Sequence, residues 1–296
     1  MKLASSSIRW TGVLVLVAIG VGIFAYGAGR GDSSAKLSYH VSLWNDMAPQ
    51  IERSLIENGP QKPADLERVY GMMLPHHIPA TIPRLVRFYS RLKETQEVKN
   101  FIVIGPDHND SGKAPVTVSN ASFFTVYGEI EPIPGIPEEL SSAGIASIEE
   151  APFDLEHSIG AQVLVISRIF PQARVTPIIL RSNVSREHAE SLGRAISKYL
   201  DEDTVLVSSV DFSHYLGTDQ AMPIDERSGA VLEALDLDSV SLVNADSGMS
   251  VAVFMRALLE KGATGTDGFE VLNTNDFMQN ADYTTGYVFG FWGQSR

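Results

Sequence analysis

The sequence places histidines directly after three predicted strands. Residues 69–74 lead into Pro75-His76-His77, residues 101–104 into Gly105-Pro106-Asp107-His108, and residues 205–210 into Asp211-Phe212-Ser213-His214. Imidazoles that converge from separate loops suit a divalent transition metal, because its nitrogen ligands must arrive from different directions. We therefore predict that His76 and His108 bind one metal ion. The neighbouring carboxylates Asp107, Glu156 and Asp211 are expected to orient these imidazoles or to bind the metal themselves.

Two further histidines are candidates for proton transfer. His157 opens a predicted helix at 158–170, and His214 stands shortly after Asp211. An imidazole has an unperturbed pKa of about 6.5, which suits general acid and base catalysis. We assign His157, His214 and Asp211 to catalysis, with capping of a turn as the alternative role of Asp211. His77 is expected to be a neighbour of the site, because adjacent residues of an extended chain face opposite sides.

Helical periodicity and short apolar runs alternate along the chain. The predicted helices are 51–58, 82–92, 158–170, 188–200, 228–235 and 251–259. The predicted strands are 69–74, 101–104, 116–118, 175–180, 205–210, 269–272 and 287–292. This alternation predicts an α/β fold with a mainly parallel or mixed sheet flanked by helices. In such folds, ligands bind where loops leave the carboxyl ends of strands, which is where the histidines stand.

Composition excludes several classes of function. The 296 residues include 23 Lys and Arg against 36 Asp and Glu, so the net charge is -13 and no basic run interrupts it. Such a surface repels phosphate backbones, and we expect no nucleic-acid partner. The chain has no cysteine, which excludes disulfides, thiolate zinc sites and thiol catalysis. Any metal must therefore be held by histidine and carboxylate. A serine nucleophile near His214 is the alternative chemistry, but serines clustered locally do not supply a triad.

The N-terminal region has the composition of a membrane segment. Residues 11–29 are uncharged and mostly apolar, and two basic residues precede them. A helix of this length can cross a hydrocarbon core of ~30 Å. We therefore predict a signal-anchor within 1–30, a linker at 31–40 and one domain at 41–296 on the extracytoplasmic side of a membrane. A cleaved signal peptide is the alternative, and it leaves a secreted or periplasmic domain.

Five short motifs occur in a fixed order along the predicted domain. They are Pro75-His76, Gly105-Pro106-Asp107-His108, Glu156-His157-Ser158, Ser209-Val210-Asp211-Phe212-Ser213-His214 and Thr284-Thr285-Gly286-Tyr287. In this order they resemble the Memo family, whose prokaryotic members are often called AmmeMemoRadiSam system protein B. The family's fold is similar to that of the class III extradiol ring-cleaving dioxygenases, which are non-haem iron enzymes. The resemblance implies an α/β sandwich in which His76 and His108 bind a single metal ion, with Asp211 and His214 close by.

The sequence departs from the family pattern in two loops. His77-Ile78-Pro79 stands where relatives carry Ala-Gly-Tyr, and Asn244-Ala245-Asp246-Ser247-Gly248-Met249 stands where many relatives carry a Cys-Gly pair that supplies a third ligand. Asp246 is the side chain of this loop that binds Fe(II) well, and with His76 and His108 it forms a set of two histidines and one carboxylate. The alternative role of Asp246 is to cap a helix that begins near Ser250.

These residues fit two functions. The first is an enzyme that uses Fe(II), with Zn or Cu as alternatives, to bind O2 and a small aromatic or oxygen-rich substrate. The loss of a soft thiolate disfavours Cu(I). The second is a module that binds metal and a small-molecule or peptide ligand without turnover, outside the cytoplasm. A cytoplasmic role beside a radical-SAM protein is a third reading, which the N-terminal segment argues against. The oligomeric state is not predicted.

Overall fold

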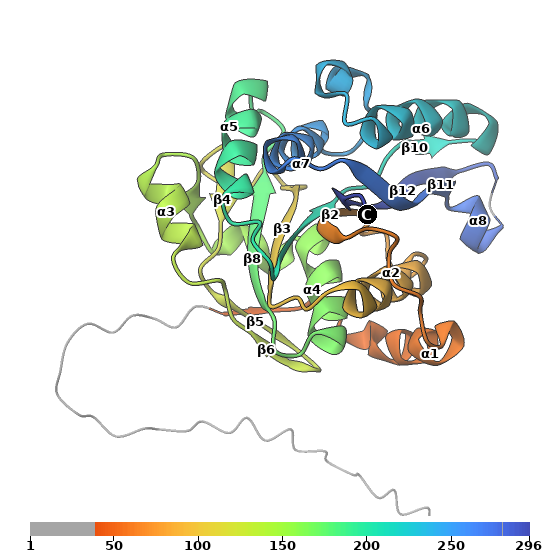
Figure 1. Ribbon diagram of the computed structural model, residues 1–296, viewed down its shortest axis with the longest axis horizontal. Coiled ribbons are helices and arrows are strands. Elements are labelled where there is room, and N and C mark those ends of the chain that lie inside the picture. The colour runs from red at the N-terminus through yellow and green to blue at the C-terminus, as the bar shows by residue number, and fades with distance from the viewer. Residues whose placement is uncertain (1–38, 280) are drawn as a thin grey trace, which may run out of the picture. The chain divides into compact units, whose positions relative to one another are not determined.

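Strands and helices are interspersed along the described part of the chain (Figure 1). The computed structural model describes residues 39–279 and 281–296, and these belong to one unit, Leu37–Arg296. The apolar runs form strands and the amphipathic segments form helices, as the periodicity of the sequence predicts. The result is a mixed α/β fold with helices flanking sheets.

The main sheet has nine strands within the described residues. In sheet order, eight of them are β10 (His214–Leu216), β12 (Thr284–Gln294), β2 (Arg68–Leu74), β9 (Thr204–Ser209), β3 (Asn100–Pro106), β8 (Arg174–Leu180), β4 (Val116–Val118) and β7 (Ser147–Ile148), and β11 (Gly265–Asn273) pairs with β12 off this path. The central strands β2, β9, β3 and β8 run parallel, whereas β12 runs antiparallel to β2 and β4 runs antiparallel to β8. The carboxyl ends of the four parallel strands therefore meet at one edge of the sheet.

A small second sheet has the order β1 (Tyr39–Val41), β5 (Ser122–Thr125) and β6 (Gly128–Ile130). The helices are α1 (Ala48–Asn58), α2 (Ile82–Thr95), α3 (Ile136–Ser142), α4 (His157–Ile169), α5 (Arg186–Ser197), α6 (Thr218–Glu233), α7 (Gly248–Lys261) and α8 (Asn275–Met278). Residues 39–279 and 281–296 also form three short 3-10 helices, η1 (Asn45–Met47), η2 (Ala151–Leu155) and η3 (Leu237–Leu242).

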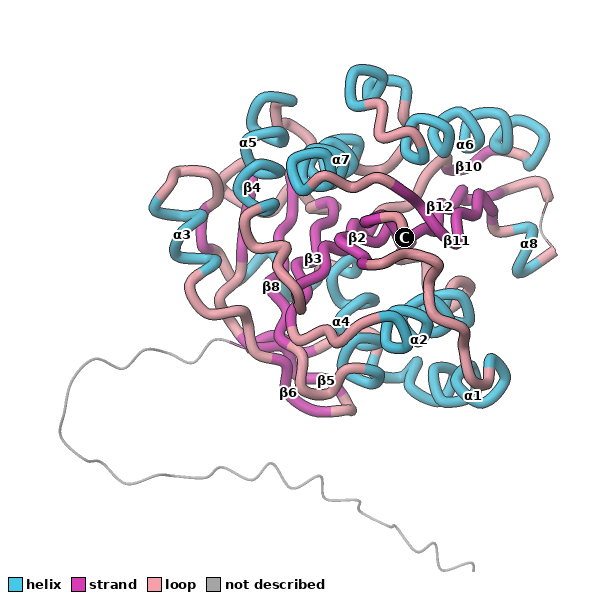
Figure 2. The backbone as a smooth tube through the Cα atoms, in the orientation of Figure 1, coloured by secondary structure: helices cyan, strands magenta, loops and turns pink. Residues whose placement is uncertain are grey.

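Helices cover both faces of the main sheet (Figure 2). One hydrophobic core joins α1, α2 and α4 to one face, and a second joins α3, α5, α6 and α7 to the other. Strand β3 supplies both cores, because Phe101 and Val103 point into the first and Ile102 and Ile104 into the second. A strand buried on both faces reads as a continuous apolar run, and it holds the loop that follows it rigidly.

The fold class predicted from the sequence included one N-terminal membrane segment, and this part is wrong. None of the helices in 39–279 and 281–296 has the length and apolar character needed to cross a membrane. Residues 11–29, to which the segment was assigned, lie outside the described residues. The helices that are described are amphipathic or are buried between the sheet and its neighbours, because their apolar residues serve the two cores.

Candidate metal centre

Hydrogen bonds to the end of β9 and to the loop after it hold His76 in place. It follows β2, and its backbone N–H donates to Asp211 Oδ1 over 3.0 Å. Its ring Nδ1 donates to the backbone carbonyl of Ser209 over 3.2 Å, because a carbonyl oxygen can only accept. Its Nε2 lies 3.1 Å from Asp246 Oδ2 and 3.6 Å from Asp211 Oδ2. The side chain is almost fully buried.

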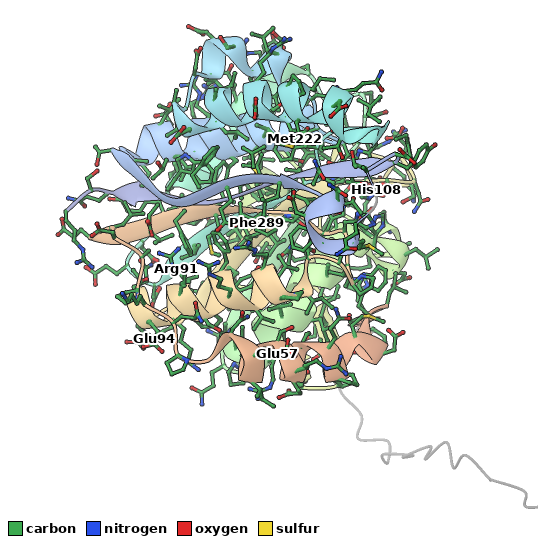
Figure 3. All side chains as sticks on the ribbon, turned by 90° about the vertical axis from the view of Figure 1, so that its right-hand side faces the viewer. Glu57, Arg91, Glu94, His108, Met222 and Phe289 are labelled. Atoms are coloured by element: carbon green, nitrogen blue, oxygen red, sulfur yellow. The ribbon has the colours of Figure 1, made fainter. Side chains whose placement is uncertain are left out.

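His108 lies in the loop that follows β3 (Figure 3). Its Nδ1 donates to Glu156 Oε1 over 2.8 Å, and its backbone N–H donates to Glu156 Oε2 over 2.9 Å. The other ring nitrogen, Nε2, lies 3.6 Å from Asp246 Oδ2. The rings of His76 and His108 meet edge to face, with their centroids 5.1 Å apart. One carboxylate oxygen of Asp246 therefore faces the Nε2 atoms of both imidazoles.

Glu156 orients His108 and also begins α4. Its Oε1 accepts the backbone N–H of Ser158 over 2.8 Å, which caps the helix. The side chain is 2% exposed. Burial raises the pKa of this carboxyl, but the hydrogen bonds and charge of His108 lower it by more. The net pKa of Glu156 therefore lies below its ordinary value. Glu156 is therefore an anion that fixes the ring of His108 with Nε2 directed at the centre.

The contacts of Asp246 require a positive charge at the centre. Both imidazoles use Nδ1 as a donor, so in the neutral rings Nε2 carries only a lone pair, and it faces a carboxylate oxygen. Burial lowers the pKa of His76, but Asp211 and Asp246 raise it by more, and the pKa of His108 is raised to about 10 against its burial. The same histidines hold the pKa of Asp246 well below its usual range, although burial opposes them. Either protons on the Nε2 atoms or a metal cation must therefore lie between these imidazoles and the Asp246 carboxylate.

Two overlapping groups of three side chains supply ligand atoms close enough together to hold a metal ion. One atom each of His76, His108 and His157 lies within 4.8 Å of the others, and the same holds for His76, Asp211 and Asp246. His76 is common to both groups. The expected approach of His76 to His108 is thus observed, and the loop before α7 brings Asp246 to them. Which of these side chains bind a metal stays a prediction.

Asp246 does not cap α7, which was its alternative role. The residue that does so is Ser247, whose Oγ accepts the backbone N–H of Ser250 over 3.2 Å. Asp246 instead accepts the backbone N–H of Asp211 over 3.2 Å, while its own N–H donates to the Asp211 carbonyl over 2.9 Å. This pair of bonds ties the loop before α7 to the end of β9, so the Asp246 carboxylate is held over His76.

His157 lies against His108, with their rings stacked at 3.9 Å between centroids. Its pKa is lowered to about 4 by burial and by the charges of His108 and His76. This ring is therefore neutral at pH 7, and its side chain is 38% exposed. A neutral, accessible imidazole beside the centre can accept a proton.

Asp211 and His214 stand in one motif of the sequence, but they have different surroundings in the structure. Asp211 is buried beside His76, and burial raises its pKa while the charge of His76 opposes the rise. His214 begins β10, which turns antiparallel onto β12, and it joins neither of the groups that could hold a metal within the described residues. It lines the cavity beside the centre instead.

His77 lines the same cavity, which agrees with its expected place as a neighbour of the site. Its Nδ1 lies 2.5 Å from the hydroxyl of Tyr287, which is itself 3.0 Å from Thr274 Oγ1. Burial lowers the pKa of His77, so its ring is neutral at pH 7. The expectation that His77 stands outside the ligand set agrees with the two groups above. Tyr287 belongs to a motif in the sequence, but nothing in its spacing indicated this contact.

Two cavities meet at His108. The larger has a volume of about 770 Å³, and its walls include the five histidines His76, His77, His108, His157 and His214 as well as Trp44, Ile78, Asp211, Tyr215, Thr274, Met278, Tyr283, Thr284 and Thr285. The smaller, of about 290 Å³, is lined by His108 and Asp246 together with Pro106, Asp107, Asp110, Leu180, Arg181, Ser182, Ser247, Gly248 and Met249. The centre is therefore accessible from two sides.

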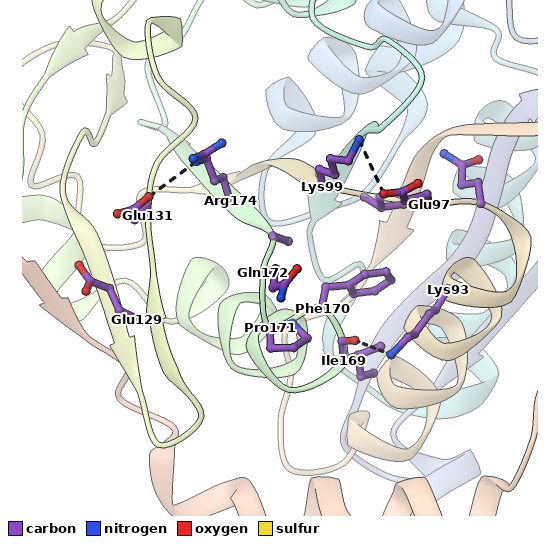
Figure 4. A pocket seen from close by; sticks show the side chains of 13 residues that line it. Lys93, Glu97, Lys99, Glu129, Glu131, Ile169, Phe170, Pro171, Gln172 and Arg174 are labelled. Carbon is purple, nitrogen blue, oxygen red and sulfur yellow. Dashed lines mark hydrogen bonds and ion pairs between the residues drawn. The ribbon is translucent and has the colours of Figure 1, made fainter.

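Another cavity, of about 810 Å³, lies away from the histidines (Figure 4). Lys99 and Arg174 on its wall stand at the amino-terminal ends of β3 and β8, whereas the histidines follow carboxyl ends. Phe170 and Pro171 give it an apolar floor, and acidic and basic side chains stand around it. It contains no histidine, so its size does not connect it with the chemistry of the centre.

Comparison with known proteins identifies relatives of this chain. A family model described as "Memo-like protein" matches residues 34–253. A MEMO1 family protein of Caldivirga maquilingensis is 26% identical over 265 residues, which cover 83% of this chain and 89% of that protein. A MEMO1 family protein of Thermococcus kodakarensis is 32% identical over 137 residues, which cover 44% of this chain and 47% of that one. A crystal structure of an uncharacterized protein from Escherichia coli matches with a TM-score of 0.44 at 13% identity, covering 74% of this chain and 100% of that one.

Proposed function

Because this chain belongs to the Memo-like protein family, we propose that it is a mononuclear metal protein in which His76, His108 and Asp246 bind the ion. The observation that carries the proposal is that both Nε2 atoms face the same oxygen, Asp246 Oδ2. The Nδ1 atoms are already used as donors to Ser209 and Glu156. Outer hydrogen bonds of this kind are found behind metal-binding histidines, where they fix the tautomer.

The chemistry of the donor set fits Fe(II). Two neutral imidazoles and one carboxylate on one side of an ion leave other positions open, as in non-haem iron proteins. Asp211 is within reach as a further oxygen donor, since its Oδ2 lies 3.6 Å from His76 Nε2. Zinc and copper remain alternatives, because imidazole and carboxylate also bind them.

We further propose that the site carries out dioxygenase-type chemistry on a small aromatic or oxygen-rich substrate. Fe(II) held by His76, His108 and Asp246 would supply Lewis acidity and O2 chemistry there. The larger cavity offers a place for a ring, because Trp44, Tyr215 and Tyr283 line it together with the histidines. His157 serves as the base that takes a proton from the substrate, because burial beside two other imidazoles keeps it neutral.

A test of metal binding comes first. Protein purified without added metal is analysed for its elements and is then titrated anaerobically with Fe(II). We expect one ion per chain in the unaltered protein, and little in His76→Ala or His108→Ala. Oxygen uptake with catechol as the probe then tests turnover, and His157→Gln should keep the metal while it slows the uptake. Loss of metal in His157→Gln would reassign that residue as a ligand.

The second candidate function is binding of a peptide or small ligand without turnover. Exposed apolar side chains favour it, since Tyr215, Met278 and Tyr283 at the larger cavity are 70%, 60% and 61% exposed. The rings of Tyr215 and Tyr283 lie 5.6 Å apart. Surfaces of this kind bind partners. A metal-loaded protein that consumes no oxygen with any catechol, but binds aromatic peptides, would favour this function over the first.

A further inference from the structure

A chain of buried hydrogen bonds runs from α2 through α4 to the back of His76. The hydroxyl of Tyr89 on α2 donates to Gln162 Oε1 on α4 over 2.9 Å. The Gln162 Nε2 group then donates to Ser209 Oγ over 2.9 Å and to the backbone carbonyl of Pro75 over 2.9 Å. The side chains of Tyr89, Gln162 and Ser209 are 0% exposed. Both hydrogens of the amide and its oxygen are therefore used inside the protein.

These bonds determine which groups donate and which accept. If the Gln162 amide were reversed, its oxygen would face the carbonyl of Pro75, and two acceptors would be in contact. The single hydroxyl hydrogen of Ser209 goes to the carbonyl of Ser158 over 2.8 Å. Ser209 Oγ, which lies 3.4 Å from His76 Nδ1, can then only accept. Because the Ser209 carbonyl also accepts, Nδ1 must carry the hydrogen, and Nε2 is left for the centre.

Gln162 acts where the strand ladder ends. Strands β2 and β9 pair up to Leu74 and Ser209, and Val210 donates to the Leu74 carbonyl over 3.2 Å. Pro75 follows, and a proline has no backbone N–H with which to continue a ladder. Its carbonyl instead accepts from Gln162, whose amide bonds both strand ends through Pro75 and Ser209. These are the ends that carry His76 and Asp211.

The position of Gln162 in α4 indicates a positioning role. Nearly all of this helix is buried, and most of the buried residues around Gln162 are apolar. Burying an amide costs free energy unless it is fully hydrogen-bonded, whereas an apolar side chain at this position would pack without that requirement. Packing alone therefore does not explain a glutamine here. A polar network whose members are all satisfied specifies one geometry.

We propose that Gln162, through Ser209 and the carbonyl of Pro75, is a positioning residue that fixes the direction of His76 Nε2 toward Asp246. The proposal rests on the proposed function, because it assumes that His76 Nε2 binds the metal. Gln162 itself does not touch the centre; its effect is transmitted through the backbone of Pro75 and through Ser209. Outer partners of metal-binding histidines typically change metal affinity by about 10 to 100-fold.

Two adjacent serines provide a matched test. Ser208 and Ser209 both lie in β9 and are both 0% exposed, but Ser208 Oγ has no hydrogen-bond partner among the described residues. Ser208→Ala and Ser209→Ala therefore remove the same atom from neighbouring buried positions, and only the second breaks the network. Gln162→Met is the third variant, because methionine keeps the length of the side chain without its donors. If Gln162→Met does not fold, the pair of serine variants still decides.

Co(II) is the probe, because its visible spectrum reports ligand geometry as well as affinity. We expect Ser209→Ala and Gln162→Met to bind Co(II) about 10 to 100-fold more weakly than the unaltered protein, with a changed spectrum. Ser208→Ala should match the unaltered protein in both. Equal affinity and equal spectra in Ser208→Ala and Ser209→Ala would overturn the proposal, whatever their thermal stability.

A second measurement separates this proposal from the metal site. In metal-free protein, the His76 Nδ1–H proton should give a slowly exchanging low-field NMR signal, identified by its absence in His76→Ala. We expect the signal to persist in Ser208→Ala and to be lost or to exchange faster in Gln162→Met and Ser209→Ala. If the unaltered protein binds no Co(II), the proposed function fails, and this signal alone supports or overturns the positioning role.

Discussion

Two regions of this protein surround a buried histidine with carboxylates, and they differ in what the ring nitrogens can do. In the first, His40 Nδ1 lies 2.8 Å from Asp154 Oδ1, and His40 Nε2 lies 2.9 Å from Glu150 Oε2 and 3.1 Å from Ser119 Oγ. In the second, His76 and His108 each use Nδ1 on a supporting acceptor and turn Nε2 to a shared oxygen of Asp246.

The difference lies in the second ring nitrogen and in the space beside it. Both nitrogens of His40 are used by acids, so its imidazolium ring joins β1 to the segment around η2, and His40 lines none of the three cavities described above. The centre instead adjoins two cavities, and its two Nε2 atoms face the same oxygen of Asp246. A histidine between carboxylates is therefore not in itself a metal site. A metal site also requires ring nitrogens from different histidines that converge, while the other nitrogen of each ring is already hydrogen-bonded.

The largest expected effect is a difference in metal affinity between variants of His76 and of His40. His76→Ala should weaken Fe(II) or Co(II) binding by more than about 100-fold, because loss of an outer partner alone costs about 10 to 100-fold. His40→Ala should leave affinity and stoichiometry unchanged. Metal titrations of the two variants make the measurement. Loss of metal from His40→Ala with the fold intact would remove the distinction between the regions.

The next effect concerns the carboxylate of the centre. Asp246→Ala should lose metal nearly as severely as His76→Ala, because it removes the anion that both imidazoles face. Ser247→Ala, one residue along, should cost about 1 kcal/mol of stability through loss of the α7 cap while its metal content stays unchanged. Elemental analysis and thermal unfolding of both variants check this. Retained metal in a folded Asp246→Ala would direct attention to Asp211 and His157 as ligands.

A smaller effect concerns stability at His40. His40→Gln removes the cation between Glu150 and Asp154, and we expect it to lower the free energy of unfolding by about 2 kcal/mol. The figure is below that of a fully buried pair, because Asp154 is 61% exposed. Chemical denaturation of metal-free protein measures it. A change within experimental error would show that the His40 cluster contributes no stability.

The smallest effect is the pH dependence of that difference. Burial lowers the pKa of His40, but hydrogen bonds to Glu150 and Asp154 raise it by more, so the folded pKa lies above 6.5. The contribution of protonated His40 to the free energy of unfolding is then complete below pH 6.5, and it is lost as the pH rises through the pKa of His40 in the folded protein. For Glu150, burial raises the pKa but the bonds to His40 and Ser119 lower it to a net value below 4.5, so its contribution is lost at acid pH. The stability advantage over His40→Gln should therefore be largest between about pH 4.5 and 6.5, and an advantage that grows above pH 8 would contradict this assignment.

Sequence patterns predicted the central strands well and most of the short elements poorly, although the three-residue strand β4 was predicted at its observed bounds. Apolar runs place β2, β3, β8 and β9 within one or two residues of their observed bounds, because strands buried on both faces need continuous apolar sequence. Helix α6 begins at Thr218, ten residues before the predicted start at Ser228, because Pro223 and the polar residues around it conceal the helix. The small sheet of β1, β5 and β6 was not predicted, since strands of three or four residues carry little periodicity.

The candidate site was predictable where position in the fold decides it. His76 and His108 follow β2 and β3, two parallel strands with β9 between them, and the shared direction of these strands predicts that the two histidines lie at the same edge of the sheet. The inward orientation of Asp246 depends on its bonds to Asp211, and the role of Gln162 depends on contacts between four separate elements. No local pattern records such contacts.

The most direct test of the metal centre is a crystal structure of the protein loaded with Fe(II) or Co(II), with anomalous scattering measured at the metal edge. We expect a single anomalous peak about 2.0 to 2.2 Å from His76 Nε2, His108 Nε2 and an oxygen of Asp246. The Nδ1 atoms should still be bonded to the Ser209 carbonyl and to Glu156. A peak elsewhere, or a loaded protein in which Asp246 is turned away from the ion, would contradict it.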